Sequence, residues 1–216
     1  MKSICLVIAI MSVLCFTACT SVDNDPIEGT PLYESVKNTY GIEEVSYGMP
    51  NADQIPSVTL DQMQAILEAL RADSNKKNNC LVELAGDANF GGVDEVNKKV
   101  VMGCEYAAKT RTGSLLENFL LRVELKFNID NGQVFYYGTD YLFNSRLFDW
   151  RANGLSLSPA KNKDGYTYEF ESESFLYFKV KDKADCLVKV GIIFKGEYNF
   201  KTEAGTYSFQ LEKNSK

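Results

Sequence analysis

The sequence contains no histidine, the side chain that proteins use most often as a general base near neutral pH and as a metal ligand. Its absence excludes Ser-His-Asp and Cys-His catalysis. A hydrolase built from paired carboxylates remains an alternative, and it would need two acidic groups in one cleft, about 5–10 Å apart. We therefore expect a protein that is not an enzyme and that has no cofactor and no metal site.

The chain also has no excess of positive charge and no long apolar segments after its N-terminus. It has 23 lysines and arginines against 29 aspartates and glutamates, a net charge of −6. Binding to nucleic acid depends on a basic face, so nucleic acid is not an expected partner. A transmembrane helix needs roughly 20 apolar residues, and no segment beyond the N-terminal one approaches that length. The mature chain is therefore expected not to span a membrane.

The N-terminus carries Lys2, an apolar run over residues 4–16 and small residues before Cys19. This order is typical of a secretory signal peptide. The sequence Phe16-Thr17-Ala18-Cys19 resembles the lipobox of bacterial lipoproteins, with Phe16 where leucine is usual. The resemblance implies that residues 1–18 are a signal peptide and that the Cys19 thiol carries a diacylglycerol. The alternative is an ordinary signal peptide that is cut elsewhere.

Residues 19–31 have the composition of a lipidated tether or linker. Within them, Asp23-Asn24-Asp25 resembles the acidic surface-export tether of Bacteroidetes lipoproteins, although a plain polar linker is an equal alternative. The chain as a whole resembles the small uncharacterised lipoproteins of that group. The resemblance implies a lipid anchor in the outer membrane, with the protein facing the periplasm or the cell surface.

Residues 32–216 are expected to form one β-rich domain with a single helix. Residues 32–58 are punctuated by glycine and proline and are predicted to be irregular. A capping box, with Thr59 as cap and Gln62 reaching back, predicts a helix over 59–73. The apolar stripe of this helix, which should pack on a sheet, consists of Leu60, Met63, Ile66, Leu67 and Leu70.

After residue 80 the apolar residues alternate with a period of two, which is typical of antiparallel strands with one wet face. The expected strands cover residues 80–86, 99–108, 118–129, 134–143, 154–158, 165–171, 175–182, 186–195, 197–202 and 206–212. This pattern predicts a mainly β fold, either an antiparallel, lipocalin-like barrel or a β-sandwich. A cystatin-like sheet that wraps the helix is the alternative.

Three cysteines follow the export signal: Cys80, Cys104 and Cys186. In an oxidising compartment they can form at most one intramolecular disulfide. Cys80 and Cys104 lie at the ends of expected strands and are the candidate pair, while three free thiols are an equal alternative. The stretch 86–95 begins with the spacing of a calcium loop but has Lys98 where a glutamate is required, so it predicts a plain loop.

The pair Asn131-Gly132 favours a two-residue type I′ hairpin. Counting back from that turn places Asp140 on the apolar face, opposite Val123. A buried carboxylate needs a partner or a wet cavity. The alternatives are a hairpin end that leaves the core, or a β-bulge that turns Asp140 outward.

The same register predicts a polar face with aromatic side chains among charges. Its members are Arg122, Glu124, Lys126, Phe135, Tyr137, Tyr141 and Phe143. Such rings can stack on sugars, or they can be ordinary cross-strand pairs. Trp150 is the only tryptophan; it lies in an expected connection and is either a loop anchor or a ligand platform.

These features favour a lipid-anchored envelope protein that binds a small apolar ligand or a glycan. The candidate binding residues are Arg122, Glu124, Lys126, Tyr137, Asp140, Tyr141, Phe143 and Trp150. The alternative is an interaction protein or accessory subunit of an outer-membrane complex. A cavity lined by Asp140 and its neighbours would favour the first hypothesis. A filled core with an exposed aromatic patch would favour the second.

Overall fold

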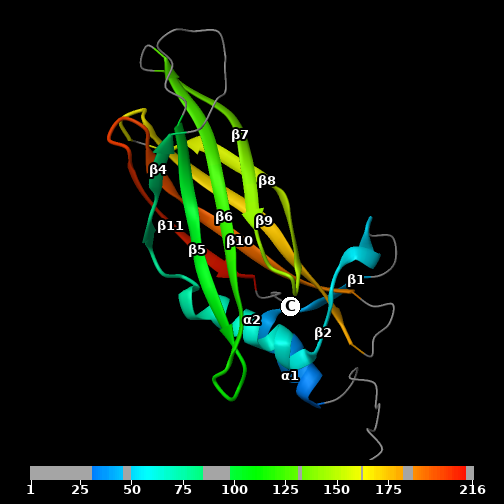
Figure 1. Cartoon of the computed structure of the whole chain (residues 1–216). Helices are drawn as coiled ribbons and strands as arrows, with labels where there is room; N and C mark the ends of the chain where they lie inside the picture. Colours follow the sequence, from blue (N-terminus) through cyan, green and yellow to red (C-terminus); the bar gives the residue numbers. More distant parts are fainter. Residues whose placement is uncertain are drawn as a thin grey trace, which may run out of the picture.

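The computed structural model describes residues 31–45, 50–84, 98–130, 133–161, 163–181 and 187–212. The predicted signal peptide, Cys19, nearly all of the predicted linker, the pair Asn131-Gly132, the stretch 86–95 and Cys186 lie outside these ranges. Within them the fold is mainly β, as predicted (Figure 1). None of the helices in the described ranges combines the length and the apolar character that crossing a membrane requires.

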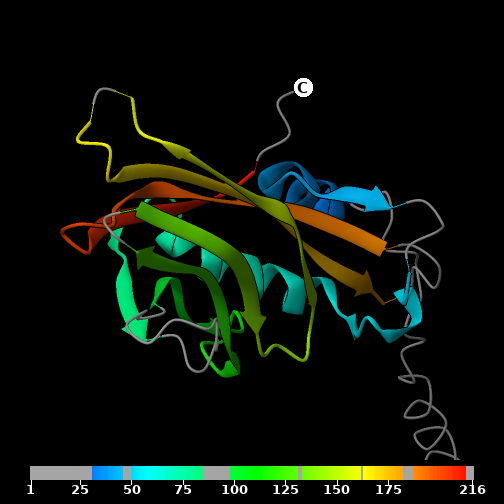
Figure 2. The ribbon, with the colours of Figure 1, turned by 90° about the horizontal axis from the view of Figure 1, so that it is seen from above.

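The strands form two sheets, an arrangement within the predicted class of antiparallel barrel or sandwich (Figures 1 and 2). The seven-stranded sheet contains β1 (Glu43–Val45), β2 (Ser57–Val58), β3 (Asn78–Asn79), β8 (Asp149–Pro159), β9 (Thr167–Val180), β10 (Leu187–Asn199) and β11 (Ala204–Leu211). The four-stranded sheet has the order β4 (Leu81–Leu84), β5 (Lys98–Lys109), β6 (Leu115–Asp130) and β7 (Gln133–Phe143). The chain passes from one sheet to the other between β7 and β8.

Helix α2 (Leu60–Asp73) confirms the predicted helix and its cap. The Gln62 backbone N–H donates to Thr59 Oγ1 at 3.2 Å, and the Thr59 backbone N–H donates to the Gln62 side chain at 2.9 Å. The predicted stripe is buried, and α2 contacts β5 of one sheet and β9 and β11 of the other. The helix therefore belongs to the core that the two sheets share.

Helix α1 (Pro31–Tyr40) corrects the prediction that this segment is irregular. Tyr33, Val36 and Tyr40 are spaced at three and four residues and are buried, which is the pattern of an amphipathic helix. Gly41 ends the helix with a φ of 64°, in the left-handed region that glycine adopts without steric cost. Gly41, one of the glycines from which an irregular segment was predicted, is thus the C-terminal cap of a helix. A short 3-10 turn (Ala52–Gln54) follows β1.

Strands β9 and β10 each replace two shorter strands in the prediction. The expected break after residue 171 falls at Glu171-Ser172-Glu173-Ser174, where the chain stays extended. Ser172 and Ser174 keep the two-residue alternation and are fully buried, while the glutamates point outward. The second expected break, near Gly196, is also absent, because β10 pairs with β9 along its whole length. The apolar alternation in the sequence is interrupted at these two places, but the strands themselves continue through them.

Aromatic rings from both sheets meet in the core. The ring centroids of Phe127 on β6 and Phe200 after β10 are 4.6 Å apart, in an edge-to-face arrangement. Tyr106 on β5 meets Phe209 on β11 at 5.8 Å in the same way. Because these pairs span the two sheets, the sheets stabilise each other through large, specifically oriented side chains.

Candidate functional site

A β-bulge in the β6–β7 pairing determines where the candidate residues lie. The predicted hairpin register is confirmed from Asp130–Gln133 to Phe127–Tyr136. Tyr137 is then an extra residue on β7, so Lys126 pairs with Gly138 and Glu124 with Asp140. Since successive side chains point to opposite faces, one extra residue reverses the face of everything that follows. Asp140 therefore does not face the apolar core, and the alternative of a β-bulge that turns it outward is confirmed.

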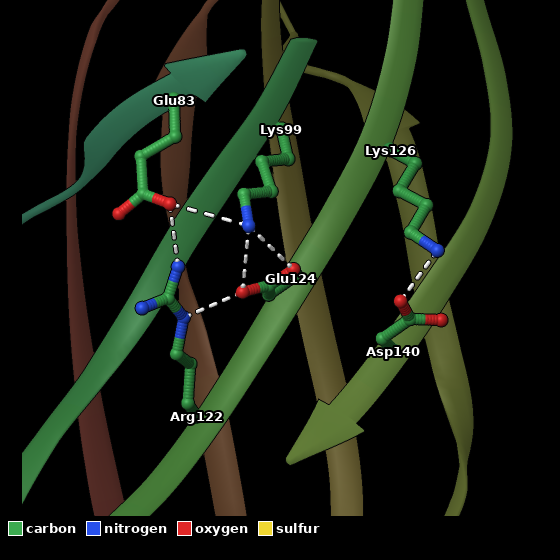
Figure 3. Close-up of polar contacts among 6 residues, drawn as sticks. All are labelled: Glu83, Lys99, Arg122, Glu124, Lys126 and Asp140. Carbon is green, nitrogen blue, oxygen red and sulfur yellow. Dashed lines mark hydrogen bonds and ion pairs between the residues drawn. The ribbon is translucent and has the colours of Figure 1, made fainter. Parts of the chain in front are cut away.

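The charged candidates lie together on the outer face of the four-stranded sheet (Figure 3). The Glu124 side chain is 5% exposed and forms ion pairs with two cations. Arg122 Nε is 2.6 Å from Glu124 Oε1, and Lys99 Nζ is 3.2 Å from Glu124 Oε2. Each cation also contacts Glu83, at 2.8 Å for Arg122 and 3.2 Å for Lys99. The result is a closed network of two carboxylates and two cations across β4, β5 and β6.

The ion pairs give these residues a structural role. The hydrogen bond from Lys99, with the Arg122 guanidinium beside it, lowers the pKa of Glu83. Lys126 Nζ pairs with Asp140 Oδ2 at 2.5 Å, and this contact raises the pKa of Lys126. With its cation in place, each carboxylate is compensated, so the interpretation as cross-strand pairs fits better than a catalytic pair of acids.

Two of the predicted aromatic residues lie on the inner face instead of the polar face. Tyr141 pairs with Val123 and Phe143 with Leu121, not with Arg122 and Leu120 as expected. The Tyr141 hydroxyl is 2.8 Å from Ser172 Oγ on β9, and burial raises its pKa. The bulge thus separates the predicted face into an outer charged network and an inner aromatic group.

Trp150 lies in strand β8, not in a connection as predicted, and is 5% exposed. Its ring centroid is 5.7 Å from that of Tyr141 and 6.4 Å from that of Phe143. Phe143 also stacks on Phe148 at 6.2 Å. We call Tyr141, Phe143, Phe148 and Trp150 the aromatic corner, since they lie where the chain turns from β7 into β8.

Strand β7 is the edge of the four-stranded sheet, and in the described ranges it pairs only with β6. It carries five of the eight exposed large apolar side chains of the described residues. They are Phe135 (48% exposed), Tyr136 (41%), Tyr137 (36%), Leu142 (41%) and Phe143 (37%). We call this strand and these side chains the β7 edge. Of its members, sequence reasoning missed Tyr136 and Leu142.

The predicted Cys80–Cys104 disulfide is not formed, and both thiols are free. Leu81 pairs with Val101, so Cys80 lies beside Met102, two residues before Cys104. The Cα atoms of the two cysteines are therefore separated by two residues along the strand, about 6.6 Å, and also by the spacing between strands. This separation is longer than a disulfide can bridge. Burial raises the pKa of Cys80 to about 12. Within the ranges described, no three acidic or cysteine side chains come together as metal ligands do.

The fold and the site together define a two-sheet, mainly antiparallel β protein with an aromatic edge strand and no recognisable catalytic centre in its described part. The chain belongs to the family described as "Domain of unknown function (DUF5033)", whose model matches residues 23–211. No curated protein and no solved structure matches the chain. The family assigns no activity, so function must be argued from the geometry.

Proposed function

We propose that this protein is a non-catalytic, lipid-anchored binding protein of the bacterial cell envelope. In this proposal the β7 edge binds an extended segment of a partner protein, which adds to the sheet as a further strand. The observation that carries it is the gathering of exposed aromatic and aliphatic side chains on one edge strand. The accessory-subunit hypothesis is thereby favoured over a binding cavity around Asp140, because Asp140 faces outward and pairs with Lys126.

Edge strands present unpaired backbone donors and acceptors, and proteins usually protect them with charges, proline or short length. Strand β7 has 11 residues and no proline. Its one charged residue is Asp140, which Lys126 compensates. Among the residues that the structure describes, the bulge at Tyr137 is the feature that protects this edge. An edge of this composition suits strand addition, in which backbone hydrogen bonds give affinity and alternate side chains give specificity.

The position of the edge supports a protein partner over a lipid surface. In Figure 1, α1 lies at one end of the molecule and the start of β7 at the other. A chain tethered through Cys19 would have α1 nearest the membrane. Phe135, Tyr136 and Tyr137 would then face away from the bilayer, toward other proteins of the envelope.

The partner can be tested by photo-crosslinking in living cells. A photoreactive phenylalanine analogue replaces Phe135 in the full chain, and the control position is Leu115, which is 56% exposed but lies at the start of β6. We expect position 135, and not position 115, to crosslink to one protein through a peptide that mass spectrometry identifies. Crosslinking to lipid, equal crosslinking at both positions, or none at any β7 position would overturn the proposal.

Strand addition requires that the backbone amides of β7 form hydrogen bonds with the partner. A synthetic peptide of the crosslinked segment should slow hydrogen exchange at the amides of β7. The double variant Phe135→Asp/Leu142→Asp should weaken peptide binding at least tenfold, while Leu115→Asp leaves it unchanged. Unchanged exchange in β7 would mean that the partner docks on side chains only, and would contradict strand addition.

The lipid anchor has its own test. Cells fed with labelled palmitate should label the wild-type protein, and Cys19→Ser should lose both the label and its place in the membrane fraction. A labelled Cys19→Ser variant, or an unlabelled wild type, would contradict lipidation at this residue without bearing on the β7 edge.

A further inference from the structure

Trp150 carries a buried donor with no partner. Its Nε1 atom is shielded from solvent and makes no hydrogen bond within the part of the chain that the structure describes. Buried donors in folded proteins are nearly always satisfied by protein or by ordered water, because an unpaired donor loses its hydrogen bonds to water. The unpaired N–H of Trp150 is therefore a donor that a molecule entering the aromatic corner could satisfy.

The neighbouring polar groups do not supply the missing acceptor. Tyr141 and Ser172 share one hydrogen bond at 2.8 Å. Ser174 Oγ, also on the inner face of β9, donates to the Ile192 carbonyl at 3.2 Å. The rings around Trp150 are otherwise those of Phe143 and of Phe194, the latter at 6.1 Å. The tryptophan thus has apolar walls and one polar atom without a partner.

The aromatic corner extends from the surface at Phe143 to the buried Trp150. Phe143 is 37% exposed, and Tyr141 is half-buried. On β8, the side chains of Leu155 and Leu157 are packed against the core but only partly buried. A small molecule that displaces the Phe143 ring would reach Trp150 along apolar surface, without breaking the β7–β6 pairing.

We propose that the aromatic corner binds a neutral apolar molecule that carries a hydroxyl, carbonyl or ether oxygen, and that this oxygen accepts from Trp150 Nε1. An acceptor is required because the indole nitrogen only donates. A neutral group is favoured over a carboxylate, since the aromatic corner contains no cation. Arg151, the next residue, is held by Asp149 at 2.7 Å and by the Pro50 carbonyl at 3.0 Å. This site shares Phe143 with the β7 edge but uses the inner face of the strand, whereas strand addition uses its backbone edge.

Because Trp150 is the only tryptophan, its indole N–H gives a single signal in a ¹⁵N-labelled full chain. Titration with 1-octanol, the probe, should shift this signal downfield in a saturable way, whereas octanoate at equal concentration should bind at least tenfold more weakly. A signal that does not move with 1-octanol, or that moves equally with octanoate, would overturn the proposal.

Substitution separates the hydrogen bond from the packing. Trp150→Phe keeps a ring and removes the N–H, and it should weaken 1-octanol binding about tenfold by calorimetry. Tyr177→Phe removes a polar atom from the outer face of β9 and should have no effect. Equal affinity in Trp150→Phe would contradict the role of Nε1.

If that variant does not fold, the shift of the indole signal in the wild-type protein still tests the proposal. Phe135→Asp should leave 1-octanol binding intact, so failure here is distinguishable from failure of the partner proposal.

Discussion

The Tyr141 hydroxyl on β7 and Ser172 Oγ on β9 form a hydrogen bond of 2.8 Å that joins the two sheets. Ser172 is completely buried, whereas Tyr141 is partly exposed. Although β7 pairs only with β6 among the described strands, its second half is therefore fixed to the opposite sheet. This bond also holds one wall of the aromatic corner against Trp150, since the two rings meet at 5.7 Å.

Removal of this hydroxyl should destabilise the protein. Tyr141→Phe leaves Ser172 buried without its partner, which we expect to lower the free energy of unfolding by about 1–2 kcal/mol. Ser172→Ala should cost a similar amount, and the double variant less than the sum of the two. Urea unfolding of the four proteins gives the coupling energy, expected at about 1 kcal/mol. Strictly additive effects would mean that the bond does not form in solution.

The parts of the fold that local residues determine could be predicted from the sequence. The Thr59–Gln62 capping box needs only a four-residue segment, and the structure has it. The register predicted from the Asn131-Gly132 pair is confirmed for the first pairs of the flanking strands, because register close to a turn depends mainly on the length of the turn. The mainly β class followed from the period-two pattern, which reports burial on one face.

Features that depend on distant contacts could not be placed from the sequence; a β-bulge was one of the alternatives for Asp140, but its position was not predicted. The bulge at Tyr137 is an irregularity of pairing between two strands, and one residue was enough to move Asp140, Tyr141 and Phe143 to the opposite face. Its sequence signal is the run Phe135–Gly138, where three aromatic residues interrupt the alternation. The continuity of β9 through Ser172 could not be read from hydropathy, since the reason for burying serine is the partner hydroxyl on another strand.

Two glycines offer a matched test of backbone crowding. Gly103 on β5 and Gly154 on β8 have positive φ values of 129° and 136°. An added Cβ at Gly103 would lie 2.1 Å from the Leu121 carbonyl oxygen, whereas at Gly154 nothing lies within 4 Å. Gly154→Ala should cost only backbone strain, about 1–3 kcal/mol. Gly103→Ala should cost at least about 2 kcal/mol more, or prevent folding, as measured by urea unfolding. Equal costs would mean that β5 and β6 separate easily.

The buried and the exposed ion pairs on the outer face should contribute differently to the free energy of unfolding. Glu124→Ala removes a carboxylate that is 5% exposed and leaves Arg122 and Lys99 partly buried and uncompensated. We expect a loss of about 2–3 kcal/mol, below the range for fully buried pairs because the cations keep some solvent contact. Asp140→Ala is the control, because its pair with Lys126 is 43% and 32% exposed, and should cost less than about 1 kcal/mol. A smaller loss for Glu124→Ala than for Asp140→Ala would contradict the network.

The same network predicts how stability changes in acid. Lys99 and then Arg122 lower the pKa of Glu83 below its usual value of 4.5, so the folded protein binds this proton more weakly than the unfolded chain does. The stability that Glu83 contributes is therefore complete above the unfolded pKa and is lost as the pH falls below 4.5 through the folded value. Urea midpoints measured from pH 7 to pH 3 should fall less steeply at the acid end for Glu83→Gln than for the wild type. Because Glu83 is 42% exposed, 1 M salt should reduce this difference. Identical acid profiles for the two proteins at low salt would show that Glu83 makes no such pair in solution.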